Sequence, residues 1–172
     1  MGLSKFPAGM WPTHAAWLND PNIPMLNRMV VWRALTDIGI CEDPLGSNMG
    51  KEVENYLVRA GVDASVINAG KGYWCGAAIG MWFIDAGARV PQDYASCDAW
   101  LPYLRDMPKV GAAVLYGIPG DARHIELIVR LKPCVLTVGG NKALSGISND
   151  GNVVDMGPQV RKDILGYVYP EQ

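Results

Sequence analysis

The feature that most constrains this chain is a long apolar stretch, residues 72–87 (GYWCGAAIGMWFIDAG), with a cysteine near its start. From Cys75 onward, the large or apolar residues recur at positions 75, 78, 79, 82, 83 and 86, which is the spacing of one face of an α-helix. Gly87 follows the last of these positions, and glycine is a typical residue at which a helix ends. The pattern predicts a buried helix that carries Cys75 in its first turn.

A cysteine at that position has two plausible roles. The first turn of a helix holds unpaired backbone N–H groups at the positive end of the helix dipole, and these favour the reactive thiolate. Free cysteine is also among the most buried residue types, and a cysteine on an apolar stripe commonly does no more than pack. A catalytic role for Cys75 therefore requires a base and an orienting group elsewhere in the chain.

Composition and length limit the classes of function. The 172 residues suffice for one domain with a substantial core and leave little room for a second. The net charge of −2 gives no electrostatic reason to expect nucleic acid or an anionic membrane as a partner. The longest apolar run, between Lys71 and Asp85, is too short to span a membrane, and the N-terminal residues lack the apolar core of a secretory signal. We therefore expect a protein that is made in the cytoplasm and needs another route to a substrate outside it.

The four cysteines, at positions 41, 75, 97 and 134, form no CxxC pair of the kind that binds zinc or acts as a redox dithiol. We expect no metal ion and no organic cofactor. One disulfide among Cys41, Cys97 and Cys134 is compatible with the sequence, although three unpaired core cysteines are the favoured interpretation.

Residues 1–26 are rich in proline and tryptophan and show neither helical nor strand periodicity, which predicts an extended N-terminal arm. We expect its tryptophans to pack on the rest of the chain, because so much exposed indole is unfavourable. Docking of the arm onto a larger assembly is the functional alternative, and His14 within it is expected at the surface. Residues 27–172 then form a single domain.

Within this domain, helical patterns come first and strand patterns second. Helices are expected at residues 27–38, 48–60, 75–86 and 94–105, with a loop over 62–72. Strands are expected at 110–117, 124–131 and 134–138, near 147, and at 153–154 and 165–169, with a hairpin turn at 149–152. This order predicts an α+β domain in which helices pack on a small antiparallel sheet.

A histidine and an asparagine are placed where they could serve Cys75. His124 begins the second predicted strand, 49 positions after Cys75. Alternate strand residues share a face, so His124 and Glu126 point one way while Ile125 points the other. The next strand ends in a Gly-Gly-Asn turn at Asn141, whose side-chain carbonyl could accept a histidine N–H and hold the ring. Cysteine, histidine and asparagine thus follow in the order nucleophile, base and orienting residue.

Five segments are together similar to the cysteine, histidine-dependent amidohydrolase/peptidase (CHAP) family and its NlpC-type relatives. They are EDPLGSN at residues 42–48, YWCGAA at 73–78, PKVGAAVL at 108–115, HIELIV at 124–129 and VGGN at 138–141. The cysteine segment is the most specific of the five. The resemblance spans about residues 33–155.

The resemblance implies a papain-like α+β fold and cleavage of amide bonds in bacterial peptidoglycan, often by phage lysins or tail-associated enzymes. It implies that Cys75 is the nucleophile, that His124 is the base and that Asn141 orients His124. The backbone N–H of Cys75 would help to form the oxyanion hole. Tyr73 and Trp74, beside the nucleophile, are accessory candidates.

Two departures from the family pattern bear on the site. The first strand begins with Gly111-Ala112 where the family usually has Gly-Asp, and we expect this change to leave activity intact. His124 is followed by Ile125-Glu126, where a small residue is common at the second position. Glu126 places a carboxylate beside the cleft, so it is a second candidate for the residue that orients His124.

Two other functions stay open. A papain-like module could serve in a virion or phage tail without turnover, docking through residues 1–26. The same thiol chemistry could also act on another acceptor, as in a protease of other substrates or an acyltransferase. The complete set of cysteine, histidine and asparagine favours an enzyme, whereas the sequence does not choose among substrates.

Overall fold

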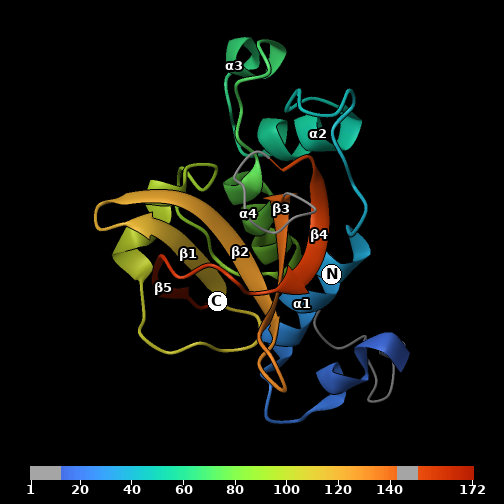
Figure 1. Ribbon diagram of the computed structural model, residues 1–172, viewed down its shortest axis with the longest axis vertical. Coiled ribbons are helices and arrows are strands. Elements are labelled where there is room, and N and C mark those ends of the chain that lie inside the picture. The colour runs from blue at the N-terminus through green and yellow to red at the C-terminus, as the bar shows by residue number, and fades with distance from the viewer. Residues whose placement is uncertain (1–12, 143–150) are drawn as a thin grey trace.

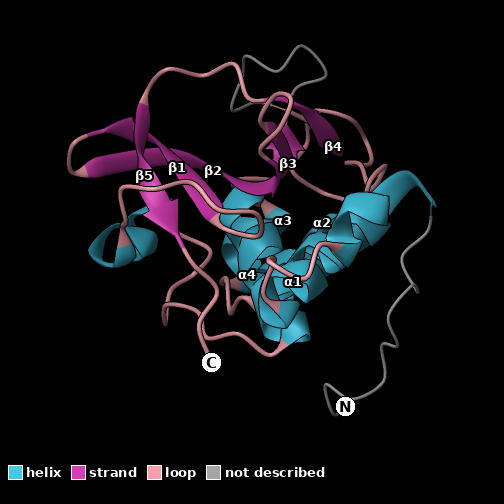
Figure 2. Ribbon diagram, turned by 90° about the horizontal axis from the view of Figure 1, so that it is seen from below, coloured by secondary structure: helices cyan, strands magenta, loops and turns pink. Residues whose placement is uncertain are grey.

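The computed structural model describes residues 13–142 and 151–172. Within these ranges a five-stranded antiparallel sheet packs against a group of helices (Figure 1). The view from below shows the helices gathered on one side of the sheet (Figure 2). The helices precede the strands along the chain, so the predicted α+β architecture is confirmed.

The helical part contains both α-helices and 3-10 helices, written α and η. In chain order they are η2 (Thr13–Asn19), α1 (Met25–Thr36), α2 (Lys51–Arg59), α3 (Ala64–Asn68), α4 (Cys75–Ala86) and η3 (Cys97–Tyr103). The short helix α3 lies at one end of the molecule, away from the sheet (Figure 1).

The strands lie in the order β4-β3-β2-β1-β5. Their bounds are β1 (Ala113–Ile118), β2 (Asp121–Arg130), β3 (Leu136–Lys142), β4 (Val153–Pro158) and β5 (Ile164–Val168). The central strand β2 alternates as predicted, because Ile125 and Leu127 belong to the main core whereas Ile128 belongs to a smaller cluster. This alternation assigns His124 and Glu126 to the side of β2 that carries Ile128.

Helix α4 is the most buried element of the core, as the sequence predicts. Ten of its twelve residues are buried, and it packs against α1, β2 and β3. Gly87 follows the helix with φ at +88°, a left-handed conformation that glycine adopts without strain, and it ends α4 at the predicted position.

The N-terminal segment is partly helical where the structure describes it, rather than extended. Helix η2 precedes α1, which begins at Met25, two residues before the expected start. Leu18 is fully buried, and the indole N–H of Trp17 donates to the carbonyl oxygen of Val129 at 3.0 Å. A 3-10 helix this short is too brief for a periodicity to be recognised in the sequence. The expected packing of a tryptophan from this segment onto the domain is observed.

Other local differences follow from short-range hydrogen bonding and from proline. The loop expected over residues 62–72 contains α3, which begins after Asp63, whose carboxylate accepts the backbone N–H of Ser65 at 2.7 Å. The helix expected over 94–105 is the shorter 3-10 helix η3, and Pro102 within it removes a backbone donor that an α-helix would need. The strand expected near residue 147 lies outside the described residues, as does the first half of the turn at 149–152.

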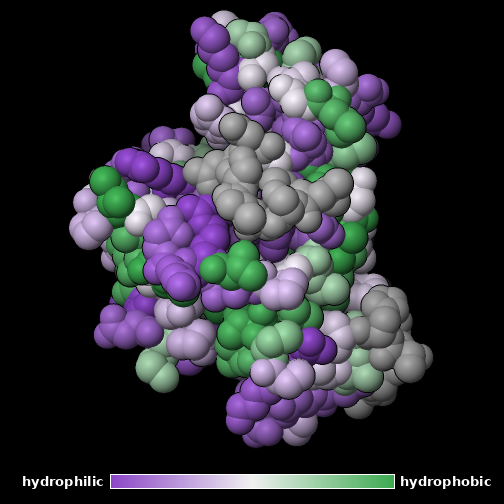
Figure 3. Space-filling view, viewed as in Figure 1, coloured by the Kyte–Doolittle hydropathy of each residue, from purple (hydrophilic) through white to green (hydrophobic). Residues whose placement is uncertain are grey.

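The surface is mixed in character. On the face drawn in Figure 3, hydrophobic residues form small groups among hydrophilic ones. In the described part of the chain, no helix has both the length and the apolar character needed to cross a bilayer.

Candidate active site

A cleft of about 680 Å³ opens beside the N-terminus of α4, and Cys75 lies in its wall. Cys75 is the first residue of α4, as predicted, and its residue surface is 4% exposed. The N–H groups in the first turn of a helix have no partner within the helix, so they are available to a negative charge in the cleft. The other walls come from the loop before α4, from the segment before η3 and from the start of β2.

His124 lies near the start of β2 and is almost completely buried. Its ring stacks on Tyr116 of β1, with ring centroids 6.1 Å apart, because the two residues are paired in the antiparallel register. Its Nε2 lies 3.4 Å from Glu126 Oε1, whereas Nδ1 has no hydrogen-bond partner. The imidazole and the Cys75 thiol interact electrostatically, so Nδ1 is the nitrogen available to take the thiol proton.

The carboxylate of Glu126 joins three buried polar side chains. Its Oε1 lies 3.4 Å from both His124 Nε2 and Lys142 Nζ, and its Oε2 accepts a hydrogen bond from the Tyr116 hydroxyl at 3.3 Å. Lys142 also donates to Thr137 Oγ1 at 3.2 Å. We call His124, Glu126, Lys142 and Tyr116 the Glu126 cluster. Its charges act on one another strongly, because little solvent separates or screens them.

The surroundings of Cys75 stabilise its thiolate. A hydrogen bond from the Cys97 thiol holds the pKa of the Cys75 thiol well below its ordinary value, although burial alone would raise it. The charge of His124 and the backbone N–H of Gly76 lower this pKa further. A lowered thiol pKa is typical of reactive cysteines, so Cys75 is distinguished from a cysteine that only packs.

The pKa values of His124 and Glu126 move in opposite directions. Burial alone would lower the His124 pKa, but the Cys75 thiolate and the Glu126 carboxylate outweigh it and raise this pKa to about 9. Burial alone would raise the Glu126 pKa, but His124 and Lys142 outweigh it and lower this pKa to about 2. At neutral pH the site therefore favours a thiolate, an imidazolium and a carboxylate side by side.

Asn141, the residue favoured by the sequence as the partner of His124, makes a different contact. It lines the cleft with Cys75, and its Nδ2 donates to Asn48 Oδ1 at 3.4 Å. Its Oδ1 is buried without a hydrogen-bond partner, and its φ of +54° lies in the left-handed region that asparagine tolerates. The structure brings Glu126, the second candidate, to the His124 ring instead.

The two accessory candidates occupy different environments. Tyr73 is 63% exposed in the cleft wall, where a substrate could contact it. Trp74 is fully buried, stacks on Tyr56 and donates its indole N–H to Glu42 Oε1 at 2.9 Å. A side chain added at Gly140 would lie 2.6 Å from the Trp74 ring, so β3 passes directly over this indole. Trp74 therefore supports the position of Cys75 by packing.

Sequence reasoning missed two residues of the site. The Sγ atom of Cys97 lies 3.6 Å from that of Cys75, a contact that its place in the sequence does not indicate. Lys142 directly follows the Gly-Gly-Asn segment, which lies within β3 rather than in a turn, and this adjacency is the one signal that could have identified it. The four cysteines are unpaired, but Cys41 and Cys134 are exposed, so their expected place in the core is wrong.

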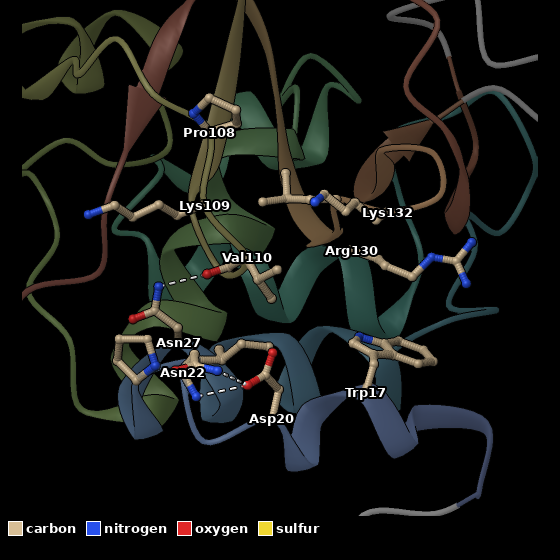
Figure 4. A pocket seen from close by; sticks show the side chains of 12 residues that line it. Trp17, Asp20, Asn22, Asn27, Pro108, Lys109, Val110, Arg130 and Lys132 are labelled. Carbon is tan, nitrogen blue, oxygen red and sulfur yellow. Dashed lines mark hydrogen bonds between the residues drawn. The ribbon is translucent and has the colours of Figure 1, made fainter.

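A second cavity, of about 510 Å³, lies between the residues around the start of α1, the segment before β1 and the end of β2 (Figure 4). Trp17 and Asn27 lie on one side of it, and the Asn27 side chain donates to the carbonyl oxygen of Val110 at 2.7 Å. None of its lining residues is a cysteine, serine or histidine, and it shares no lining residue with the cleft. Across residues 13–142 and 151–172, no group of three or more His, Cys, Asp or Glu side chains could hold a metal ion. This second cavity therefore offers no thiol or histidine, whereas Cys75 and Cys97 both line the cleft.

Comparison with known proteins supports the fold. No family model and no curated protein matches the chain in sequence. The fold is similar to the solved structure of the peptidoglycan hydrolase RipB from Mycobacterium tuberculosis, with a TM-score of 0.51 and 18% sequence identity. The similarity covers 94% of this chain and 73% of the RipB chain. The papain-like α+β fold expected from the sequence is thereby confirmed.

Proposed function

We propose that this chain is a cysteine-dependent amidohydrolase or endopeptidase that cleaves amide bonds in bacterial peptidoglycan. The observation that carries the proposal is the pairing of the Cys75 thiol with a buried histidine, itself in contact with a carboxylate, in the wall of an open cleft. The fold shared with a peptidoglycan hydrolase supports the substrate class.

The proposed reaction has two steps on one thiol. The Cys75 thiolate attacks the amide carbonyl carbon, and N–H groups at the start of α4 stabilise the oxygen that becomes negative. The His124 imidazolium gives its proton to the leaving amine, so the C–N bond breaks and a thioester remains on Cys75. Neutral His124 then takes a proton from water, the resulting hydroxide attacks the thioester, and Cys75 leaves as the thiolate.

Glu126 is proposed as the residue that orients His124, in place of Asn141. Its carboxylate lies against Nε2, which leaves Nδ1 to exchange protons with the thiol and the leaving group. The low pKa of Glu126 keeps it charged when His124 is protonated, so it stabilises the imidazolium between the two steps. Asn141 is assigned to the cleft wall, where its unpaired Oδ1 could accept an N–H from a substrate.

The rim of the cleft suits a polar peptide. Lys71 and Arg123 supply positive charge, Asp121 supplies negative charge and Tyr73 supplies an exposed ring. A stem peptide of peptidoglycan carries ionised groups of both signs together with short apolar side chains. Delivery to the wall during lysis or from a virion, and docking of residues 1–26 on a partner, stay predictions from the sequence.

Mass spectrometry of soluble fragments released from purified peptidoglycans tests the proposal. We expect the wild-type chain to create new amine and carboxyl termini at one kind of amide bond, and the Cys75→Ala variant to create none. Cys134→Ala is the matched control, because it removes an exposed thiol outside the cleft and should cut like the wild type. If the folded wild-type chain leaves the peptidoglycans intact, the proposal is refuted. The remaining interpretations are then a non-catalytic module and an enzyme that acts on another substrate.

A further inference from the structure

The mechanism uses one thiol, but the cleft contains two. Cys97 lies across from the nucleophile, with 3.6 Å between the two Sγ atoms, and both residues line the cleft. The other two cysteines, Cys41 and Cys134, are exposed and are not among the residues that line the cleft. The nucleophile therefore has one specific neighbouring thiol.

Two glycines of α4 allow this close approach. A side chain at Gly76 would lie 2.4 Å from the carbonyl oxygen of Ala95, and one at Gly80 would lie 1.9 Å from the ring of Tyr94. The chain can therefore lie directly on α4 just before it reaches Cys97. A larger residue at either glycine would move this segment, and the second thiol with it, away from the cleft.

The start of η3 is also tied to the histidine strand. The Asp98 carboxylate accepts the backbone N–H of Ala122 in β2 at 2.7 Å, and the Trp100 indole N–H donates to the carbonyl oxygen of Tyr94 at 2.9 Å. These two hydrogen bonds fix the residues that precede and follow Cys97 in the chain. A disulfide bond is about 2 Å long, so the two sulfur atoms need to approach each other by about 1.5 Å.

We propose that Cys75 and Cys97 form a reversible disulfide under peroxide, a redox modification site that blocks the nucleophile and protects it from irreversible oxidation. The inference rests on the proposed function in one respect: the consequence of the bond is loss of hydrolysis. Formation of the bond itself is measurable without any substrate.

The chemistry balances with hydrogen peroxide as the oxidant. The Cys75 thiolate attacks one peroxide oxygen, the O–O bond breaks, and Cys75 becomes a sulfenic acid while hydroxide leaves and is protonated to water. The Cys97 sulfur then attacks the Cys75 sulfur, the S–O bond breaks, and a second water leaves with the Cys97 proton. The two thiols lose two electrons, and peroxide gains them. A small dithiol such as dithiothreitol reverses the oxidation by thiol–disulfide exchange.

Tryptic mapping tests the bond directly. Cleavage at Lys71, Arg89 and Arg105 separates Cys75 and Cys97 onto peptides 72–89 and 90–105. After stoichiometric peroxide and alkylation of free thiols, we expect the wild-type chain to yield these two peptides joined, at the sum of their masses less two hydrogens. Dithiothreitol should separate them.

Activity measured before and after oxidation tests the protective role. The wild type should lose more than about 90% of its hydrolysis in peroxide and regain it with dithiothreitol. The activity of Cys97→Ser is compared with that of the same variant before treatment. Peroxide should abolish this activity, and dithiothreitol should not restore it. Peptide 72–89 of this variant should gain two or three oxygens, because Cys75 is oxidised to sulfinic or sulfonic acid. The Cys41→Ser, Cys134→Ser double variant is the matched control and should behave like the wild type.

The outcomes separate the two proposals. Absence of the joined peptides while Cys75 accumulates as sulfinic or sulfonic acid in the wild type would overturn the disulfide, even if peptidoglycan is hydrolysed. Joined peptides in a chain that hydrolyses no peptidoglycan would support the thiol pair and refute the proposed function. If Cys97→Ser fails to fold, the mapping of the wild-type chain still decides the question.

Discussion

Asp37 and Glu126 are both buried carboxylates, but their surroundings differ. Asp37, directly after α1, is 5% exposed, and both of its oxygens are occupied. Oδ1 accepts from the Arg33 guanidinium, and Oδ2 accepts from the Tyr56 hydroxyl at 2.5 Å and from the Trp82 indole N–H at 2.8 Å. We call these four residues the Asp37 cluster. Its residues line neither cavity described above.

Glu126 is 4% exposed, so burial does not distinguish it from Asp37. Its three contacts are longer, between 3.3 and 3.4 Å, and one of its partners is His124, whose Nδ1 has no hydrogen bond. A buried polar atom without a partner costs about 1–3 kcal/mol, so a group kept in this state is expected where another molecule or a moving proton completes it. We therefore expect Asp37 to hold helices together and Glu126, beside His124, to serve the proposed reaction.

The largest expected effect is on hydrolysis and concerns Cys75, the thiol that interacts with His124 of the Glu126 cluster. Cys75→Ala should reduce hydrolysis by roughly 10³-fold or more, because the attacking atom is gone. The free energy of unfolding should change little, since a small apolar residue fits the first turn of α4. Release of soluble muropeptides and chemical denaturation measure the two quantities. Hydrolysis at the wild-type rate by the purified variant would end the thiol mechanism.

The next effect is on stability and belongs to the Asp37 cluster. Asp37→Asn should lower the free energy of unfolding by about 2–4 kcal/mol, because an amide cannot accept from all three donors and one of the two carboxylates paired with Arg33 is lost. Turnover per folded molecule should stay within about twofold of the wild type. Urea unfolding followed by tryptophan fluorescence gives the stability. A variant of normal stability with poor turnover would reverse the roles of the two clusters.

Glu126→Gln is the counterpart on the catalytic side. It keeps the shape of the side chain and removes the charge, so turnover per folded molecule should fall by about 10- to 100-fold. The loss of stability should be smaller than for Asp37→Asn, since Lys142 keeps its contact with Thr137. Steady-state kinetics and denaturation on the same preparations make the comparison. Wild-type turnover in Glu126→Gln would remove Glu126 from the mechanism.

The pH profile distinguishes a charged from a neutral partner of His124. The pKa of His124 is raised to about 9, so wild-type kcat/KM should fall as pH rises through that value and the imidazolium loses its proton. Removing the Glu126 carboxylate removes an interaction that favours the charged ring, so the alkaline limb in Glu126→Gln should move to lower pH by about one unit. An unmoved limb would show that Glu126 does not act on the histidine charge.

The smallest expected effect concerns Asn141. Because its Nδ2 contacts Asn48 and its Oδ1 faces no described partner, Asn141→Ala should raise KM by about two- to fivefold and change kcat little. A matched Asn48→Ala variant should show a similar or smaller change. Collapse of kcat in Asn141→Ala, with Glu126→Gln near normal, would restore Asn141 as the residue that orients His124.

Much of the fold and half of the site could be predicted from periodicity. The apolar spacing after Cys75 locates the core helix and its stop, and strand alternation pairs His124 with Glu126 on one face. The choice between Glu126 and Asn141 could not be made, because it depends on where a left-handed residue at the end of β3 directs its side chain. Cys97 was missed for a related reason, since its contact with Cys75 exists only because two glycines let distant segments meet.

The pH dependence of Cys75 alkylation tests the central claim, a thiolate held beside a protonated histidine. Iodoacetamide modification is followed by mass spectrometry on peptide 72–89, in the wild type and in His124→Ala. The account predicts fast alkylation of the wild type that persists far below the ordinary thiol pKa of about 8.5, and loss of that low-pH reactivity in His124→Ala. A wild-type rate that simply rises with pH through about 8.5, with no reactivity below, would contradict it.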